Sequence, residues 1–463
     1  MSLLTRVVAV ATLWSIAAGA ASLRIATFQR DVTPPLGTPL CCDGRTKPAE
    51  RIVDPLSARG LVLLGAGKPI VLVAVDWVGI GDEGSDTWRR AMAEAAGTDL
   101  DRVTVHTIHV HDAPSDEPGG ERLLEPFGLA GQFRNGAFVR SAVERTAAAV
   151  REAVKKPHLV THLRLGSAAV EKVASNRRIL GPDGKVRFGR MSSCKVPEMR
   201  AEPEGVIDPL LRSVSFWDGE RPLAVLTTYA CHPQSYYGKG GVSADFVGMA
   251  RSMREAALPG VAHIHFDGAG GNVAAGKYND GSPEMRPELA RRLAAGMKAA
   301  WESGVKVPIR AGDVRWRVVR VALPLADSLK DLDRLRKVVA DPATPVLTRL
   351  STARDLAWAQ LSTAGREIPL FRLGLGDASV LFMPGELFVE YQLEAQKLKP
   401  SAFVAMAAYG DYGPGYLGTR ISYEQGGYET GPASRTSPAV EDVLMGGIRR
   451  LVADGSSSGA GAP

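Results

Sequence analysis

Cysteine is scarce in this sequence, and its scarcity excludes one class of protein. Only four cysteines occur in 463 residues, namely Cys41, Cys42, Cys194 and Cys231. The chain is therefore not a small domain held together by disulfides. Several pairings remain open, although the adjacent Cys41 and Cys42 would pair with each other only under strain.

Long hydrophobic runs are also missing beyond the N-terminus, where no stretch approaches the roughly 18 apolar residues of a membrane span. Residues 1–6 end in the basic Arg6, residues 7–20 are mostly apolar, and residues 18–20 read Ala-Gly-Ala. This pattern predicts a secretory signal peptide over residues 1–21, cut near Ala20 or Ala21. A retained membrane anchor is the alternative, but the run is short for one. We expect a secreted or periplasmic protein without a transmembrane segment after cleavage.

A basic stripe interleaved with aromatic residues is a third missing feature. The net charge is +6 and aromatic residues make up 6%, but Lys and Arg are scattered among acids. This composition argues against a nucleic-acid partner. No sequence repeat or break in composition divides the chain, so we expect one large domain over residues 22–454 and a disordered tail over residues 455–463. The sequence does not indicate an oligomeric state.

The remaining chain alternates between β-rich and helical segments, which is typical of a layered α/β fold. Expected strands cover residues 61–64, 70–76, 103–111, 159–165, 212–217, 223–230, 261–266, 314–323, 379–383 and 403–407. Expected helices cover residues 85–96, 136–155, 244–257, 287–302, 329–339, 344–362 and 438–454. Residues 180–203, rich in Gly, Pro and charge, predict a long ordered surface excursion of the kind that often serves as a lid. We therefore predict mixed sheet layers with flanking helices.

Three of the eight histidines lie close together in Val105-His106-Thr107-Ile108-His109-Val110-His111. The segment reads as a strand, and alternate side chains of a strand share a face. His109 and His111 should then point the same way, while His106 faces the other side and is interpreted as structural. A metal site is one interpretation, and a hydrogen-bonded histidine pair on a half-exposed strand is the other.

Further ligand-type residues follow other predicted strands. His232 comes directly before Pro233 at the end of a β-rich stretch, and Glu386 follows an apolar strand in Pro384-Gly385-Glu386. The alternatives are a histidine satisfied by backbone carbonyls and an acid that stabilises a helix N-terminus. Two histidines, a carboxylate and one more oxygen donor would suit zinc, with water completing the site.

Together these segments resemble the N-terminal catalytic domain of the neutral/alkaline non-lysosomal ceramidase family. The resemblance rests on modest motifs in a specific order. These are Asp31-Val32-Thr33-Pro34-Pro35-Leu36-Gly37, Asp54-Pro55-Leu56-Ser57-Ala58-Arg59, His109-Val110-His111-Asp112-Ala113-Pro114, Tyr229-Ala230-Cys231-His232-Pro233, Val242-Ser243-Ala244-Asp245-Phe246, Pro384-Gly385-Glu386, Gly415-Tyr416 and Tyr428-Glu429.

The resemblance implies a zinc ion held by His109, His232, Glu386 and Tyr416. The alternative role for Tyr416 is that of an aromatic loop anchor.

It also implies catalytic roles around the bound substrate for His111, Arg177 and Tyr428. His111 would move a proton, while Arg177 and Tyr428 would stabilise charge on the carbonyl oxygen. The alternative role for Arg177 is a surface ion pair.

Two departures from the family stand out. Where ceramidases carry a serine beside the zinc, this chain has Ala274, which offers no hydroxyl. A mechanism that uses a zinc-activated water is compatible with that loss, and Asp267 or Asn272 is predicted to take over a substrate contact. The chain also ends soon after the last motif, with no room for the family's C-terminal immunoglobulin-like domain.

Together with the predicted signal peptide, the resemblance implies an exported, zinc-dependent amidohydrolase that acts on an N-acylated small-molecule or lipid substrate, as in sphingolipid metabolism. One alternative is a hydrolase for a different amide or ester, such as an N-acyl sugar. The other is a catalytically silent zinc protein that binds a lipid or glycan.

Overall fold

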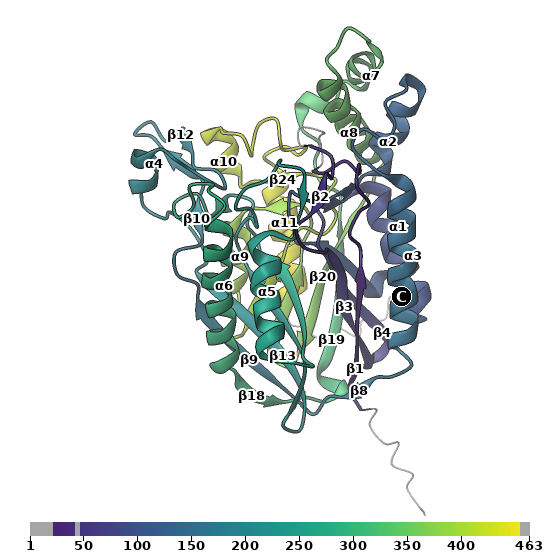
Figure 1. Cartoon of the computed structure of the whole chain (residues 1–463), viewed down its shortest axis with the longest axis vertical. Helices are drawn as coiled ribbons and strands as arrows, with labels where there is room; N and C mark the ends of the chain where they lie inside the picture. Colours follow the sequence, from purple (N-terminus) through teal and green to yellow (C-terminus); the bar gives the residue numbers. More distant parts are fainter. Residues whose placement is uncertain (1–21, 42–46, 454–463) are drawn as a thin grey trace, which may run out of the picture.

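A computed structural model describes residues 22–41 and 47–453 (Figure 1). The predicted signal peptide, the predicted disordered tail and Cys42 lie outside the described residues. Within the described residues, no helix is both long and apolar enough to cross a membrane. Cys194 and Cys231 are buried free thiols.

Three large sheets form the body of the molecule, and their four main strands follow one another in the same order (Figure 1). The first contains β1 (Arg24–Asp31), β3 (Ser57–Gly65), β4 (Gly67–Val75), β6 (Val103–Thr107) and β8 (His158–Leu159), in the order β6-β4-β3-β1-β8. The second contains β9 (His162–Ala169), β13 (Leu210–Asp218), β14 (Arg221–Tyr229), β16 (Ala262–Asp267) and β18 (Val305–Pro308), in the order β16-β14-β13-β9-β18. The third contains β19 (Val314–Val321), β20 (Ile368–Leu375), β21 (Ala378–Phe382) and β23 (Val404–Ala407), in that order.

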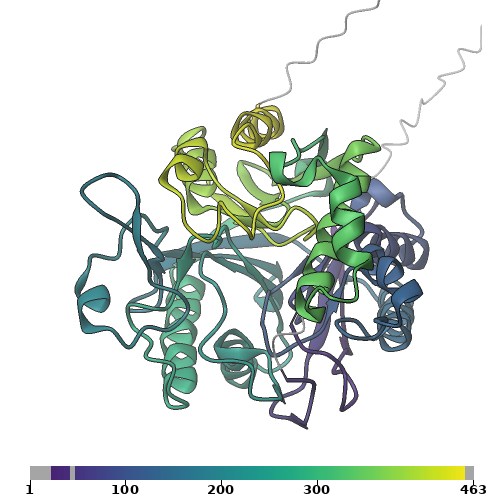
Figure 2. The same ribbon diagram turned by 90° about the horizontal axis from the view of Figure 1, so that it is seen from above.

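Each sheet belongs to a unit with the same connectivity, although the sequence shows no repeat. Three antiparallel strands are followed by a crossover helix and by a last strand that pairs in parallel with the third strand. The crossover helices are α1 (Asp82–Ala96), α5 (Asp245–Ala257) and α9 (Val389–Lys397). A second helix then packs against the first strand of each sheet, namely α3 (Gly136–Ala153), α6 (Met285–Glu302) and α11 (Val440–Val452). Seen from above, the three units occupy different sides of the molecule (Figure 2).

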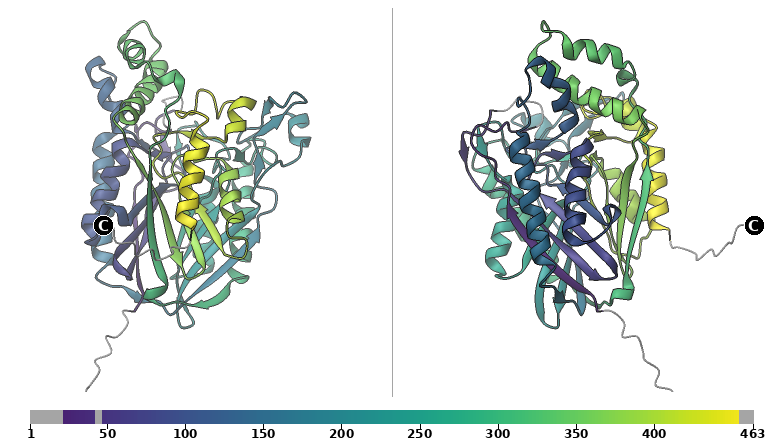
Figure 3. Two further views of the ribbon diagram at one scale, coloured as in Figure 1. Left: turned by 180° about the vertical axis from the view of Figure 1, so that it is seen from behind. Right: turned by 90° about the vertical axis from the view of Figure 1, so that its right-hand side faces the viewer.

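Figure 3 shows the outer helices in place, with α1 and α3 over the first sheet and α11 over the third. Parallel strands need such crossovers, which cover the sheet faces and allow both faces to be apolar. The valines and leucines of β4 and β21 are accordingly buried.

Long insertions between the first and second strand of each unit lie at one end of the molecule, the upper end in Figure 1. They contain β2 (Arg51–Ile52) in the first unit; β10 (Ser175–Asn176), β11 (Arg178–Leu180), β12 (Val186–Gly189) and α4 (Pro197–Ala201) in the second; and α7 (Leu332–Ala340) and α8 (Val346–Thr363) in the third. The shorter elements are β5 (Gly79–Ile80), β7 (Ser115–Asp116), α2 (Pro118–Leu124), β15 (Gly241–Val242), β17 (Val273–Ala274), β22 (Glu386–Leu387), β24 (Tyr416–Leu417) and α10 (Arg420–Gln425).

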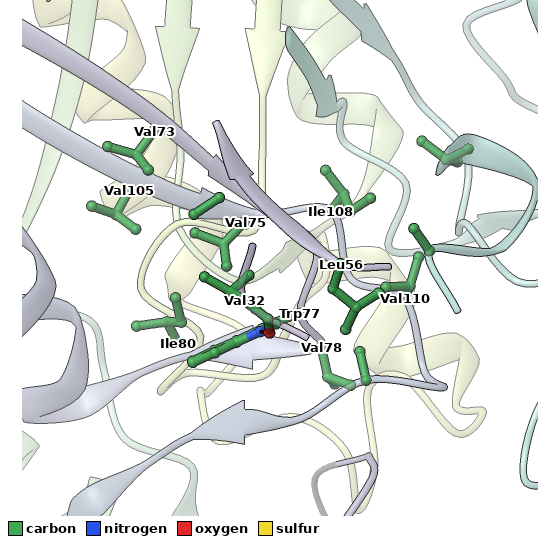
Figure 4. Packing of buried hydrophobic residues seen from close by; sticks show 14 of the residues in the cluster. Val32, Leu56, Val73, Val75, Trp77, Val78, Ile80, Val105, Ile108 and Val110 are labelled. Atoms are coloured by element: carbon green, nitrogen blue, oxygen red, sulfur yellow. Dashed lines mark hydrogen bonds between the residues drawn. The ribbon is translucent and has the colours of Figure 1, made fainter. Parts of the chain in front are cut away.

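The core of the first unit supports the chain that leaves β6 (Figure 4). Val75 and Trp77 are fully buried, and the Trp77 indole N–H donates to the Val32 carbonyl at 3.1 Å. Ile108 and Val110, which follow β6, are also fully buried. His109 lies between these two buried residues, so its side chain has little freedom to move.

The predicted α/β class, with mixed sheets and flanking helices in one large domain, is confirmed, as is the ordered excursion near residues 180–203. Three elements of eight or nine residues were missed, namely β1, β20 and α9. β1 carries Arg24, Arg30 and Asp31 among its apolar residues, so it does not read as a buried strand. α9 is short and has no clear apolar stripe.

Candidate metal centre

The centre forms where the carboxyl ends of the three parallel strand pairs meet. His109 follows β6, His232 follows β14, and Glu386 follows β21. Backbone hydrogen bonds join these ends across sheets: the Ala408 amide donates to Asp267 at 2.8 Å and the Thr107 amide donates to Tyr409 at 3.0 Å. Ligand-type residues from three distant parts of the sequence are thus brought together.

His109, His232 and Glu386 form one compact, fully buried group, and their ligand atoms all lie within 4.8 Å of one another. The Glu386 Oε2 atom lies 2.8 Å from His232 Nε2 and 3.2 Å from His109 Nε2. Three donor atoms therefore converge on one small volume.

The opposite nitrogen of each of these imidazoles is bound to the backbone. His109 Nδ1 lies 2.7 Å from the Val78 carbonyl, and His232 Nδ1 lies 2.6 Å from the Gly270 carbonyl. A carbonyl oxygen can only accept, so the proton sits on Nδ1 and the Nε2 lone pair faces Glu386. Histidines that bind metals are oriented in this way by carbonyls behind them.

Electrostatics favours a neutral imidazole at His232. Burial and the Arg177 charge lower the pKa of His232 to about 4. Two neutral nitrogen donors and a carboxylate are a donor set that fits a divalent cation such as zinc.

The strand predicted over residues 103–111 is wrong beyond Thr107. β6 ends at Thr107, and His109 has a φ of 54°, outside any strand conformation. The chain turns there because the Ile108 amide donates to Val75 and the Thr107 amide donates to Tyr409. His111 nevertheless points the same way, with its Nε2 at 3.3 Å from His109 Nε2.

His106 and His111 differ in their surroundings. His106 is fully engaged by the protein, with the Ala408 carbonyl at 2.6 Å and the Thr104 hydroxyl at 2.7 Å, in keeping with a structural role. The Nδ1 of His111 instead faces the Cys41 thiol at 3.7 Å. Burial lowers the pKa of His111 well below its usual value.

Tyr416 lies beside the compact group. It belongs to β24, which pairs in parallel with β22, so Tyr416 is directly opposite Glu386. Its hydroxyl lies 3.2 Å from His232 Nε2 and accepts a hydrogen bond from Arg177 Nη2 at 3.0 Å. Burial raises the pKa of the phenol well above its usual value, while the Arg177 charge opposes that rise. Its role as the fourth zinc ligand stays a prediction.

Arg177 and Tyr428 border this group from the second and third units. Arg177 is only 2% exposed, so its interpretation as a surface ion pair is wrong. It pairs instead with the buried Glu429. Tyr428 is 46% exposed and meets the Tyr416 ring edge-on, with centroids 5.7 Å apart. Tyr428 therefore lies on the solvent side of Tyr416.

The residues predicted to contact substrate are fully buried. The Asn272 amide oxygen accepts from the Val389 N–H at 2.9 Å, and its nitrogen donates to Glu390 at 2.8 Å, so both ends hold the start of α9. Asp267 lies 3.2 Å from His265, and burial raises its pKa well above the usual value. Ala274 is fully buried in β17, opposite Ser175 of β10. The substrate contacts proposed for Asp267 and Asn272 stay predictions.

Sequence reasoning missed two side chains that support the centre. The Tyr412 hydroxyl donates to Glu386 Oε1 at 2.9 Å, which leaves Oε2 facing the histidines. Glu429 binds Arg177. The tyrosine-rich segment and the Tyr428-Glu429 pair were both visible in the sequence, but nothing there shows which of their side chains turn inward.

Comparisons with known proteins give a likeness in structure alone. No protein-family model matches the chain, and no curated protein matches its sequence. A neutral ceramidase from Pseudomonas aeruginosa has a similar structure, with a TM-score of 0.68 at 15% identity over 93% of this chain and 74% of the ceramidase. A ceramidase complexed with C2 gives a TM-score of 0.67 at 15% identity over 93% of this chain and 75% of that chain. The predicted ceramidase-type fold is thereby confirmed.

Proposed function

We propose that this protein is an exported, zinc-dependent hydrolase that cleaves an amide bond of an N-acylated small-molecule or lipid substrate. One observation supports this proposal most directly. The imidazoles of His109 and His232 are each held at Nδ1 by a backbone carbonyl, and their Nε2 atoms converge on one oxygen of Glu386. The likeness in fold to two ceramidases supports the choice of a hydrolase.

His109, His232 and Glu386 would hold the zinc ion, with the Tyr416 oxygen beside them. When bound, zinc supplies an activated water and polarises a carbonyl group.

The neighbouring side chains provide the remaining chemistry. Arg177 presents a buried guanidinium that can bind the substrate carbonyl oxygen and stabilise the negative charge that develops there. His111 can accept a proton from the water and return it to the leaving amine. Tyr428, on the solvent side, can contact the substrate as it enters.

Ala274 makes water the expected nucleophile, because no hydroxyl is present at that position. It also favours a second candidate substrate class, a different amide or an ester such as an N-acyl sugar. Export is proposed on the N-terminal sequence pattern of residues 1–21.

The test combines metal analysis with a substrate screen. Purified wild type, His109→Ala and the control His158→Ala, which changes an exposed histidine of β8, are assayed for zinc and for hydrolysis of N-acyl sphingosines, N-acyl amino sugars and simple esters. We expect zinc and activity in wild type and the control, and neither in His109→Ala. Wild type without zinc under zinc-replete conditions contradicts the proposal. Zinc-bound wild type that is as inactive as His109→Ala on every substrate indicates the silent binding protein.

A further inference from the structure

A single buried carboxylate, Glu429, lies between two consecutive arginines next to the metal centre. Its Oε1 accepts from Arg177 Nε at 3.1 Å and from Arg177 Nη2 at 2.9 Å. Its Oε2 accepts from Arg178 Nη1 at 3.1 Å. Glu429 is 2% exposed, so these charge-assisted bonds are shielded from water.

These bonds determine which edge of the Arg177 guanidinium remains available. Nε and Nη2 face Glu429, and Nη2 also donates to the Tyr416 hydroxyl at 3.0 Å. Within residues 22–41 and 47–453, Nη1 makes no hydrogen bond. Because a guanidinium is a rigid planar fork, fixing one edge fixes the direction of Nη1.

Arg178 anchors the same carboxylate from the other side. Its Nη2 donates to the Ser422 carbonyl at 2.9 Å, and its guanidinium lies over the Phe388 ring at 5.4 Å. Arg178 thus ties Glu429 to the protein frame, while Arg177 reaches toward Tyr416.

The loop that carries Glu429 is shaped for this close approach. Gly427 has a φ of 101°, and a Cβ at this position would lie 2.9 Å from Arg178 Nη1 and 3.4 Å from Glu429 Oε2. Glycine at position 427 therefore lets the loop pass close to Arg178. The loop then places Glu429 inward, while the adjacent Tyr428 faces solvent.

We propose that Glu429 is a positioning residue that acts through Arg177, holding Nη1 ready for the substrate carbonyl oxygen. The inference rests on the proposed hydrolase function. Without the carboxylate, Arg177 loses the partner of two of its nitrogens and can rotate away from the carbonyl position. His109, His232 and Glu386 keep their own partners, because Glu429 makes no hydrogen bond to them.

The test compares Glu429→Gln with Glu424→Gln, which removes a nearby exposed carboxylate on α10. In Glu429→Gln we expect kcat to fall by about tenfold to hundredfold, KM to change little and zinc content to stay at the wild-type level. The control should behave as wild type. A Glu429→Asp variant, which keeps the charge on a shorter side chain, should recover part of the lost kcat and serves if the glutamine variant does not fold.

A double-mutant cycle separates positioning from general structural support. In an Arg177→Ala background, Glu429→Gln should cause no further fall in kcat, because the group through which it acts is gone. Equal falls in both backgrounds, or loss of zinc in Glu429→Gln, overturn the inference while leaving the proposed function intact. A zinc-bound wild type that hydrolyses no substrate overturns the proposed function. The positioning role of Glu429 is then overturned as well, because it depends on that function.

Discussion

The imidazole of His109 stacks on the phenol ring of Tyr409, with ring centroids 4.7 Å apart and 22° between the planes. The two residues occupy equivalent places, shortly after the last strands β6 and β23 of the first and third units. Both have left-handed backbones, with φ of 54° and 61°. Such a conformation is strained for a residue with a side chain, and it persists where packing holds it. The stack therefore joins two units at the metal centre.

Tyr409→Ala should weaken metal binding. The substitution removes the buried ring that supports His109, so we expect about tenfold weaker zinc affinity and a stability loss of about 3 kcal/mol. Competition with a chelator and chemical denaturation measure the two effects. Tyr409→Phe keeps the ring and removes only the hydroxyl near His232, so its affinity should stay close to wild type. Equal weakening in both variants would show that the hydroxyl, rather than the stack, matters.

Tyr412→Phe tests the support of the carboxylate ligand. The Tyr412 hydroxyl donates to Glu386 Oε1 at 2.9 Å, and without it the carboxylate can rotate. Loss of such an outer hydrogen bond lowers metal affinity by about 10-fold to 100-fold. The matched control is Tyr423→Phe, whose hydroxyl bonds to Ser434 and Thr436 instead. Zinc titration should separate the two variants, and similar affinities would contradict the assigned role of Tyr412.

Local sequence patterns were enough to predict much of the fold and part of the candidate site. Strands such as β4 and β21 are continuous apolar runs, and the ligand-type residues His232 and Glu386 follow such runs closely. Short-range patterning is enough to locate residues of this kind. Their convergence was inferred from the family resemblance, because contacts between units depend on packing that no local pattern records.

What the sequence could not show depends on long-range geometry. The three units share a connectivity without sharing residues, so no periodicity reveals them. His109 leaves its strand because of hydrogen bonds between the Thr107 and Ile108 amides and carbonyls distant in sequence. The inward turn of Glu429 depends on Arg177 and Arg178 being in place. Each of these features is decided by tertiary contacts.

Ala274→Ser tests the departure from the ceramidase pattern. Ala274 is fully buried, so an added hydroxyl should lower stability by about 1 kcal/mol. We expect zinc content to be unchanged and hydrolysis of an N-acyl sphingosine to exceed that of wild type. Ala275→Ser, which adds the same hydroxyl at the next buried position, should show no gain. If Ala274→Ser shows no gain either, the pocket rather than the missing serine limits the substrate.

Asp82→Asn tests a buried carboxyl at the start of α1. Both Asp82 oxygens lack a hydrogen-bond partner among the described residues, and burial with the nearby charges of Glu117 and Asp411 raises its pKa to about 8. The unfolded chain loses this proton near pH 4. Between about pH 4 and pH 8 the folded protein therefore holds a proton that the unfolded chain has released, and stability falls as pH rises through that window. The amide of the variant cannot ionise, so Tm at pH 8 should rise by roughly 2 °C or more while Tm at pH 4 stays nearly constant.

The matched variant is Asp245→Asn, at the equivalent first position of α5. Asp245 also has a left-handed backbone, with φ of 50°, but its carboxylate accepts from the Ser235 and Phe246 amides and from Arg286. An amide here loses the charge that Arg286 requires, so we expect destabilisation of about 1 to 3 kcal/mol at pH 8, opposite in sign to Asp82→Asn. Thermal unfolding at pH 4 and pH 8 checks both variants. If Asp82→Asn also destabilises the protein at pH 8, its carboxyl is ionised and bound in the folded state, and the raised pKa is wrong.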